Sequence, residues 1–307
     1  MTEHGTSSAQ RFSPEAATPY AGVVGHPISH SRSPQLHRTA YALLGELLDY
    51  GATDVEETGL VPRVEQLRHD PLWRGLSVTM PLKSEAAEIA DELTDLAEAV
   101  GVVNTLVHHG DGHVLGHNTD VAGIMGALRA AGHIPPVPRA AILGGGGTAT
   151  AAVAALQGLG ATSVDAWVRS EARAHRTVTA AEHLGLPLQL KPWEQAAEHV
   201  AGYDVVVATL PPHGCDDLAA AFAAVRGRHT TGVLLDAAYD PWPSAIARAW
   251  TRAGGQVAPG IDMLIFQAVD QIKLFTKRPL DVDLPREATV INAMCEAVGR
   301  PALAADR

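Results

Sequence analysis

The sequence predicts an α/β fold of two domains, one of them built on a doubly wound parallel sheet. The length of 307 residues is enough for two domains with a core each, at about 150 residues per domain. A hydrophobic content of 46% with 19% charged residues is typical of a globular chain. Short apolar runs alternate with longer helical patterns, and this alternation indicates parallel strands joined by right-handed helical crossovers.

The first domain is expected to span residues 20–120, after an extension over residues 1–19. The extension lacks the apolar segment of a signal peptide, and we expect it to be mobile. Ser33 and Pro34 suit the N-cap and N1 positions of a first helix. Gly110 and Asp111 suit a hairpin turn. The predicted strands are 20–24, 48–53, 76–79, 102–107 and 114–116, and the predicted helices are 33–44, 60–69 and 83–100.

The second domain is expected to span residues 121–260, with a proline-rich link at 135–138. Its predicted strands are 140–143, 163–168, 205–208 and 233–236, separated by helical patterns. Residues 263–275 and 285–298 are predicted to be helical, and their periodicity does not decide which domain they pack on.

Charge and cysteine content exclude several classes of protein. The 23 Lys and Arg residues against 34 Asp and Glu residues give a formal net charge of −11. This argues against a nucleic-acid-binding protein, because phosphate neutralisation requires a basic face, and an anionic ligand would need a local cationic pocket. Two cysteines, Cys215 and Cys295, are too few for a disulfide framework or a cysteine-based zinc site, which favours a reducing, cytoplasmic location. The uncharged stretch 140–161 contains glycines at 144–147 that would break a lipid-exposed helix, so we expect no membrane span.

A glycine-rich turn follows the strand at 140–143 and precedes an alanine-rich helical pattern. Gly144, Gly146 and Ala149 match the G-x-G-x-x-A fingerprint of a dinucleotide-binding, Rossmann-type unit. The glycines would permit a tight turn and a close approach to a pyrophosphate, and the alanine would let the helix pack closely. The alternative, a tight turn inside a core of small residues, is not favoured because further strand–helix units follow. The expected cofactor contacts at this turn are Gly144, Gly145, Gly146, Gly147, Thr148 and Ala149.

The end of the next strand predicts which dinucleotide is bound. An NAD-binding domain usually places a carboxylate there for the ribose 2′-hydroxyl. Here the strand ends in Arg169 and Ser170. Arg173 and Arg176 follow, whereas Asp165 lies too early in the strand. A guanidinium can pair with a 2′-phosphate, so the sequence favours NADP over NAD; the alternative is three solvated helix arginines.

Polar residues gather at the expected strand ends of the first domain. Hydroxyls beside a helix N-terminus, such as those of Ser31 and Ser33, suit a carboxylate ligand. A lysine and an aspartate brought together, such as Lys83 and Asp120, can exchange a proton with a substrate oxygen. Taken singly, these residues also have ordinary explanations as helix caps, turn residues or a solvated helix start. The full set is Ser31, Ser33, Thr79, Lys83, Asn104 and Asp120.

Taken together, the ordered motifs resemble those of the shikimate dehydrogenase family. They are GHPISHSRSP at 25–34, SVTMPLK at 77–83, GVVNTL at 101–106, GHNTD at 116–120 and the glycine turn with its following arginine. The resemblance covers about residues 20–298. It implies reversible, NADP-dependent reduction of 3-dehydroshikimate to shikimate in aromatic amino acid biosynthesis. It also implies an N-terminal α/β substrate domain, completed by residues 261–307 as the C-terminal helices return to it. We expect a monomer or homodimer.

The resemblance implies roles for individual residues. Ser31 and Ser33 would bind the substrate carboxylate. Lys83 and Asp120 would form the catalytic pair, with Lys83 as proton donor and acceptor. The remaining residues implied are Thr79, Asn104 and Gln267 for the ring hydroxyls, Ser77 and Tyr239 for the substrate pocket, and Arg169, Ser170, Arg173, Thr209 and Gly260 for the cofactor.

Several positions depart from the family pattern. Asparagine is frequent at Ser77 and usual at Val168, glycine is usual at Asp262 and Val121, and a small polar residue is usual at Leu210. These departures leave the reaction type intact but keep quinate open as a substrate. Two other functions stay open, a catabolic quinate/shikimate dehydrogenase that uses NAD and a shikimate-sensing module without turnover. Arg169 at the end of the second strand of the second domain argues against the NAD-dependent catabolic enzyme. The presence of both Lys83 and Asp120 argues against the sensing module.

Four of the 15 histidines cluster at positions 108, 109, 113 and 117. In a hairpin, alternate side chains point to opposite faces, so these residues are poorly placed to share a metal ion. Hydride transfer to or from a nicotinamide requires no metal. We therefore expect no functional metal.

Overall fold

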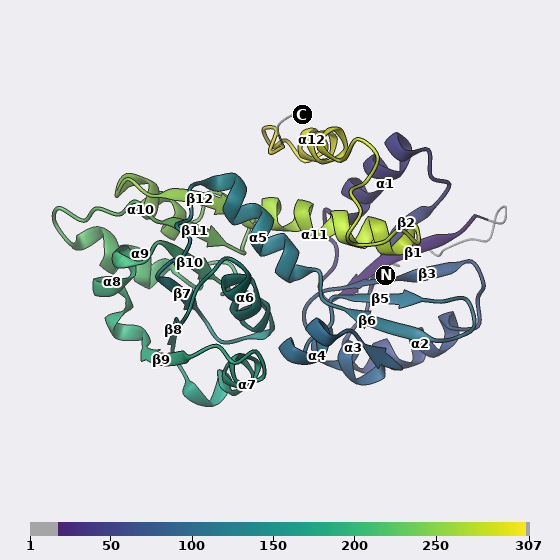
Figure 1. Ribbon diagram of the computed structural model, residues 1–307, viewed down its shortest axis with the longest axis horizontal. Coiled ribbons are helices and arrows are strands. Elements are labelled where there is room, and N and C mark those ends of the chain that lie inside the picture. Colours follow the sequence, from purple (N-terminus) through teal and green to yellow (C-terminus); the bar gives the residue numbers. More distant parts are fainter. Residues whose placement is uncertain (1–17, 305–307) are drawn as a thin grey trace, which may run out of the picture.

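The computed structural model describes residues 18–304, which form two six-stranded sheets. Figure 1 shows the sheets side by side, with the helix α5 (Asp120–Ala131) between them and α11 (Gly260–Phe275) running from the second sheet over the first. Residues 1–17, which hold most of the predicted extension, and residues 305–307 lie outside the described part of the chain.

The first sheet contains β1 (Tyr20–Gly25), β2 (Asp49–Asp54), β3 (Trp73–Val78), β4 (Glu92–Leu93), β5 (Thr105–His108) and β6 (Val114–His117). Its order is β2-β1-β3-β5-β6-β4. The strands β2, β1 and β3 are parallel, whereas β5 and β6 form the predicted antiparallel hairpin. The helices of this unit are α1 (Ser33–Leu44), α2 (Leu60–Leu67), α3 (Lys83–Ile89) and α4 (Asp95–Val100), with the 3₁₀ turn η1 (Glu57–Gly59).

The prediction of one helix over residues 83–100 is wrong, because β4 separates two short helices there. β4 pairs with β6, and the Asp91 carboxylate just before it accepts the Val114 N–H at 2.8 Å. That hydrogen bond holds the pKa of the Asp91 carboxyl below its usual range. Thr94 then caps α4, since its hydroxyl accepts the Ala97 N–H at 3.3 Å. The interruption depends on a partner 23 residues away, which helical periodicity does not report.

The second sheet contains β7 (Ala140–Leu143), β8 (Val164–Val168), β9 (Leu188–Pro192), β10 (Val205–Ala208), β11 (Val233–Asp236) and β12 (Gln256–Pro259). All its strand pairs are parallel, in the order β12-β11-β10-β7-β8-β9. This confirms the predicted doubly wound, Rossmann-type sheet. Its helices are α6 (Gly147–Gly158), α7 (His175–His183), α8 (Ala196–His199), α9 (Asp216–Ala224) and α10 (Ala245–Arg252), with the 3₁₀ turns η2 (Glu171–Arg173), η3 (Trp193–Gln195) and η4 (Val200–Gly202).

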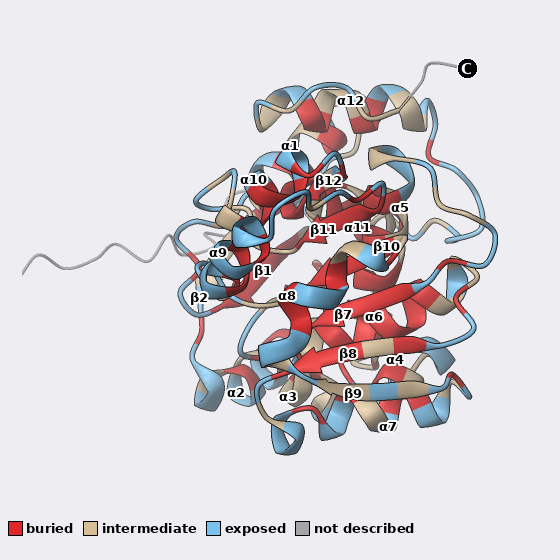
Figure 2. Cartoon of the chain, turned by 90° about the vertical axis from the view of Figure 1, so that its left-hand side faces the viewer, coloured by how far each residue is buried: buried red, intermediate tan, exposed pale blue. Residues whose placement is uncertain are grey.

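The edge strands β9 and β12 are absent from the sequence prediction. Figure 2 shows β7 and β8 mostly buried, whereas β9 is intermediate or exposed along its length. An edge strand has only one paired neighbour and tolerates polar residues and proline. Both edge strands end in proline and lack the continuous apolar run of the central strands.

The C-terminal helices return to the first sheet, which confirms that part of the predicted fold class. Ile265, Ile272 and Phe275 of α11 belong to a buried cluster with Ala21 and Val23 of β1. The last helix, α12 (Glu287–Ala297), packs against α1. Within residues 18–304, no helix is both long and apolar enough to cross a membrane.

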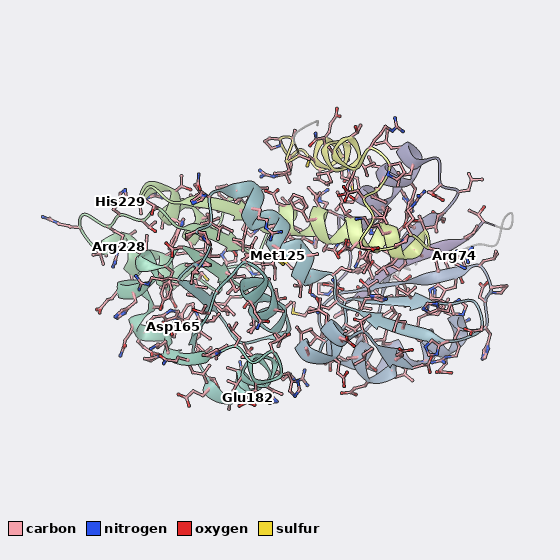
Figure 3. The ribbon with its side chains drawn as sticks, viewed as in Figure 1. Arg74, Met125, Asp165, Glu182, Arg228 and His229 are labelled. Carbon is pink, nitrogen blue, oxygen red and sulfur yellow. The ribbon has the colours of Figure 1, made fainter. Side chains whose placement is uncertain are left out.

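Two glycines bring α5 and α11 into close contact. A Cβ at Gly123 would lie 2.7 Å from the Met263 carbonyl oxygen. A Cβ at Gly126 would lie 2.5 Å from the Phe266 ring. Both distances are too short for any side chain, so the helix contact requires glycine here. Met125, on the same helix, lies between the two units in Figure 3. α5 also contacts β11 and β12, so it connects α11 to the second sheet.

Candidate active site

Side chains from both units line one cavity of about 160 Å³. The lining comes from β1 and β3, the first turns of α1, α3, α5 and α6, the loop after β11 and one face of α11. The structure brings together these predicted residues: Ser33, Ser77, Thr79, Lys83, Asn104, Asp120, Thr148, Tyr239, Gly260 and Gln267.

Lys83 and Asp120 form an ion pair in the cavity wall. The Lys83 Nζ lies 2.5 Å from Asp120 Oδ2, and the two side chains are 16% and 6% exposed. Lys83 is the first residue of α3, and Asp120 is the first residue of α5. A helix N-terminus carries a partial positive charge, which favours the Asp120 carboxylate at the start of α5 and disfavours the Lys83 ammonium at the start of α3. The charge of Asp120 compensates for this unfavourable position of Lys83. The ammonium has three N–H donors, so it can also bind a ligand oxygen.

Asn104 holds the same carboxylate from the other side. Its Nδ2 donates to Asp120 Oδ1 at 2.8 Å, and its Oδ1 accepts the Thr119 N–H at 2.7 Å. Gln267 Oε1 accepts from the Thr119 hydroxyl at 3.2 Å, while its Nε2 donates to the Leu264 carbonyl at 2.9 Å. Asp120 Oδ1 therefore accepts from the Asn104 amide, while Asp120 Oδ2 accepts from the Lys83 ammonium.

The start of α1 forms another edge of the cavity. The prediction of Ser33 as N-cap is wrong by one residue, because Arg32 occupies that position and Ser33 is the first helical residue. Ser33 lines the cavity, whereas Ser31 lies outside the lining and its Oγ accepts the Ser33 N–H at 3.4 Å. The Ser31 hydroxyl thus contacts the backbone at the helix start. Burial raises the pKa of the Tyr239 hydroxyl although the Arg32 charge opposes this, so Tyr239 is a proton-bearing donor.

The glycine turn has the shape that a dinucleotide phosphate needs. Gly144 has a φ of +112°, and a Cβ there would lie 2.7 Å from Thr209 Oγ1. A Cβ at Gly146 would meet no atom within 4 Å, so the space beside it is open. No side chain of the described residues caps α6, which leaves its first N–H groups for a pyrophosphate. Gly145, Gly147 and Ala149 complete this turn, and Thr148 also lines the cavity.

Arg169 lies directly after β8 in a fixed position. Its guanidinium lies 4.8 Å from the centroid of the Trp193 ring and donates to the Gly214 carbonyl at 2.8 Å. Asp165, labelled in Figure 3, accepts from the Tyr203 hydroxyl at 2.5 Å within the sheet. Ser170 and Arg173 follow Arg169 at the turn η2.

Arg176 is exposed, as Arg169 and Arg173 are, but it also contacts the first unit. It lies on α7 and donates to the hydroxyl of Ser84, next to Lys83 on α3. This hydrogen bond joins the two units. Arg176 therefore contacts the first unit instead of standing free for a phosphate.

The histidine cluster has structural partners. His108 is buried, with its Nδ1 3.0 Å from the Trp73 carbonyl oxygen and its ring stacked on the indole. Burial lowers the pKa of His117 to about 4, so this ring is neutral. Among residues 18–304, no group of three or more His, Cys, Asp or Glu side chains is placed to hold a metal ion.

Gln271 is the polar lining residue that sequence analysis misses. It is 1% exposed and lies four residues after Gln267, one turn further along the same face of α11. That helical spacing is the signal that could have found it. The apolar lining residues Val23, Val78, Met263 and Leu264 carry no comparable signal, because they resemble ordinary core residues.

Comparison with known proteins agrees with this geometry. Residues 23–106 match the family model described as the shikimate dehydrogenase substrate binding domain. The shikimate dehydrogenase (NADP(+)) of Rubrobacter xylanophilus is 36% identical over 279 residues, which cover 89% of this chain and 96% of that protein. The structure of Mycobacterium tuberculosis shikimate dehydrogenase is 38% identical, with a TM-score of 0.76 and coverage of 92% and 99%. The Thermus thermophilus enzyme, in complex with NADP(H) and shikimate, is 30% identical, with a TM-score of 0.74 and coverage of 91% and 99%.

Proposed function

The chain belongs to the shikimate dehydrogenase family, and we propose that its cavity binds shikimate and 3-dehydroshikimate, with Lys83 and Asp120 as the proton-transfer pair. The protein is an NADP-dependent oxidoreductase of the shikimate pathway that interconverts these two compounds. The observation that carries the residue assignment is the 2.5 Å contact between Lys83 Nζ and Asp120 Oδ2 in the wall of the cavity.

The polar groups around the cavity suit a hydroxylated ring that carries a carboxylate. Ser33 lies at the N-terminus of a 12-residue helix, where backbone N–H groups and the helix dipole favour an anion, and Tyr239 adds a hydroxyl donor. Ser31 supports this site by binding the backbone of Ser33. The ring hydroxyls would be held by Thr79, Asn104 and Gln267.

The proton step follows from the position of the ammonium. Reduction of a ketone leaves an alkoxide that needs a proton, and Lys83 supplies it from Nζ. In the reverse direction, Lys83 accepts the proton from the substrate hydroxyl. Asp120 holds the ammonium in place with Oδ2, and Asn104 holds the carboxylate through Oδ1.

The second unit would hold NADP, which supplies or accepts the hydride when bound. Support comes from the open space beside Gly146 and the uncapped N–H groups of α6. Arg169 would pair with the 2′-phosphate, because its guanidinium stands at the end of β8 and Asp165 is engaged in the sheet. The other proposed contacts are Ser170, Arg173, Thr209 and Gly260.

The two alternative functions are not favoured. A catabolic enzyme that uses NAD would be expected to have a carboxylate in place of Arg169. A sensing module would not need the ion pair of Lys83 and Asp120. We also propose a cytoplasmic location, which two buried and unpaired cysteines support, Cys215 and Cys295.

Steady-state rates and shikimate binding together test the residue assignment. Lys83→Met and Asp120→Asn should each lower kcat by about 10²- to 10⁴-fold, the usual contribution of general acid–base catalysis. Calorimetric titration should still detect shikimate binding. Lys191→Met on the edge strand β9 is the matched control and should keep wild-type turnover. Near-normal turnover of Lys83→Met would refute the assignment, and wild-type turnover only with quinate or NAD would favour the catabolic alternative.

A further inference from the structure

A buried network of polar side chains lies behind the cavity and is not used by the proton step. His37, Tyr41 and Tyr50 are at most 2% exposed, Ser77 is 4% exposed and Gln271 is 1% exposed. The His37 ring stacks on Tyr50 with centroids 3.9 Å apart. Ser77 and Gln271 also line the cavity, so the network reaches the substrate site from the core side.

The amide of Gln271 has only one orientation that fits its neighbours. One end lies 3.3 Å from the Asn104 carbonyl oxygen and 2.9 Å from Thr105 Oγ1. A carbonyl oxygen can only accept, so this end must be Nε2. The Oε1 end accepts from the Ser77 hydroxyl at 2.7 Å and lies 3.3 Å from His37 Nε2.

The other members of the network fit this orientation. Burial lowers the pKa of His37 to about 3, so the ring is neutral and carries one N–H. That hydrogen is on Nε2, which faces Gln271 Oε1, and Nδ1 accepts from the Tyr41 hydroxyl at 3.1 Å. Ser77 gives its hydrogen to Gln271 and accepts from the Tyr50 hydroxyl at 2.6 Å. Ser77 therefore has no hydrogen left for a substrate.

Gln271 is linked to Asn104 through the Asn104 backbone carbonyl and through the Thr105 hydroxyl. Thr105 Oγ1 accepts from Gln271 Nε2 and donates its own hydrogen to Asn104 Oδ1, both at 2.9 Å. The Thr119 N–H reaches the same Oδ1 at 2.7 Å. With Oδ1 held by these donors, the Asn104 Nδ2 is directed at Asp120 Oδ1 at 2.8 Å.

We propose that Gln271 is a positioning residue for the reaction, which acts through Thr105 and Asn104 to orient Asp120 and Lys83. It makes this contribution without touching the reacting atoms. The inference rests on the proposed function of the same site. It distinguishes Gln271 from its neighbour Gln267, which contacts Thr119 directly and is proposed to bind the ring hydroxyls.

Gln271→Met tests this inference, because methionine has a similar length and no hydrogen-bonding amide. We expect kcat to fall roughly tenfold to a hundredfold, the effect of losing a hydrogen-bonded orientation, while the Kd for shikimate stays near the wild-type value. Gln157→Met is the matched control. It removes a comparable amide on α6, which donates to the Leu184 carbonyl at 2.8 Å, away from the cavity. Its kcat should equal that of the wild type.

A second pair of variants keeps the test valid if Gln271→Met does not fold. Thr105→Val removes the hydroxyl that links Gln271 to Asn104, and Thr105→Ser keeps it. We expect Thr105→Val to lose kcat as Gln271→Met does, and Thr105→Ser to retain most of it.

Four outcomes would overturn the inference. They are an unchanged kcat in Gln271→Met or Thr105→Val, a rise in Kd alone, a lower Tm with unchanged kcat per folded molecule, and equal loss in Thr105→Val and Thr105→Ser. Lys83→Met is measured in the same series. Loss of turnover in Lys83→Met with full activity in Gln271→Met would reject the positioning role and leave the proposed function intact. Absence of wild-type turnover with shikimate and NADP would reject both.

Discussion

The ion pair between Asp262 and Arg300 joins the first turn of α11 to the segment after α12, and its loss should weaken the fold. The guanidinium donates to both carboxylate oxygens at 2.7 and 2.8 Å. The Asp262 side chain is 3% exposed and that of Arg300 is 25% exposed. Breaking a fully buried pair costs about 3–5 kcal/mol, because the remaining charge is uncompensated. Since Arg300 is partly solvated, we expect Arg300→Met to lower the free energy of unfolding by about 2–3 kcal/mol near neutral pH.

The loss in Arg300→Met should depend on pH with a defined sign. Burial raises the pKa of the Asp262 carboxyl, although the Arg300 charge opposes this. A carboxyl whose pKa is higher in the folded state binds its proton more tightly there. Its contribution to stability is present below the unfolded pKa and is lost as pH rises through the folded pKa. Without the guanidinium the folded pKa rises further, so the stability gap between variant and wild type should narrow on acidification.

Urea unfolding followed by tryptophan fluorescence, at about pH 7.5 and about pH 4.5, measures this gap. Asp262→Asn in the Arg300→Met background removes the stranded charge and should restore part of the loss. Arg74→Met is the matched control, because Arg74 lies on the outer side of the first unit (Figure 3) and its guanidinium makes an exposed hydrogen bond to the Pro71 carbonyl at 3.2 Å. A loss below about 1 kcal/mol, or an equal loss at both pH values, would refute the reasoning.

Three further predictions concern the helix contact, the cofactor and a buried carboxyl. Gly123→Ala should lower stability by about 1–3 kcal/mol and raise the KM for shikimate, because the added Cβ would lie 2.7 Å from the α11 backbone. Gly158→Ala, whose Cβ would meet the flexible Met125 side chain at 3.0 Å, is its control; equal thermal melts and KM values for the two variants would contradict the argument. Arg169→Leu should raise the KM for NADP roughly tenfold to a hundredfold and change the KM for NAD little. Initial rates with both cofactors measure this, and an equal rise in the two KM values would contradict the prediction. Burial raises the pKa of Asp270 to about 6. Asp270→Asn should therefore raise the free energy of unfolding by about 1–2 kcal/mol near pH 7.5 and leave it unchanged near pH 4. Urea unfolding measures this gain, and a gain that does not depend on pH would contradict the prediction.

The central strands were predictable because a strand that is buried on both faces is a nearly continuous apolar run in the sequence. The predicted strands 140–143, 205–208 and 233–236 coincide with β7, β10 and β11, whose residues are all buried. β9 and β12 carry polar residues and proline at the sheet edges, so their pairing depends on neighbours that the local sequence does not report. The break between α3 and α4 has the same origin, since β4 forms only because β6 is present as its partner.

The candidate site also has one part that the sequence predicts and another that it does not. Lys83, Asn104 and Asp120 were predictable because motifs place them at strand ends and helix starts, where a parallel sheet gathers ligand-binding side chains. The network around Gln271 was not predictable. It needs α1, β2, β3 and β5 to pack against α11 before its hydrogen bonds exist, and nothing in the local pattern of His37 or Tyr50 distinguishes them from ordinary core residues.

The α5–α11 contact explains why the acid–base pair and the substrate-binding face keep one geometry. Gly260, Leu264, Gln267 and Gln271 recur every three or four residues, so a single face of α11 runs from the cofactor side of the cavity to the buried network. Asp120 begins α5, and Gly123 packs that helix directly on the backbone of α11 one turn later. The separation of Asp120 from the substrate face is therefore determined by two helices in van der Waals contact.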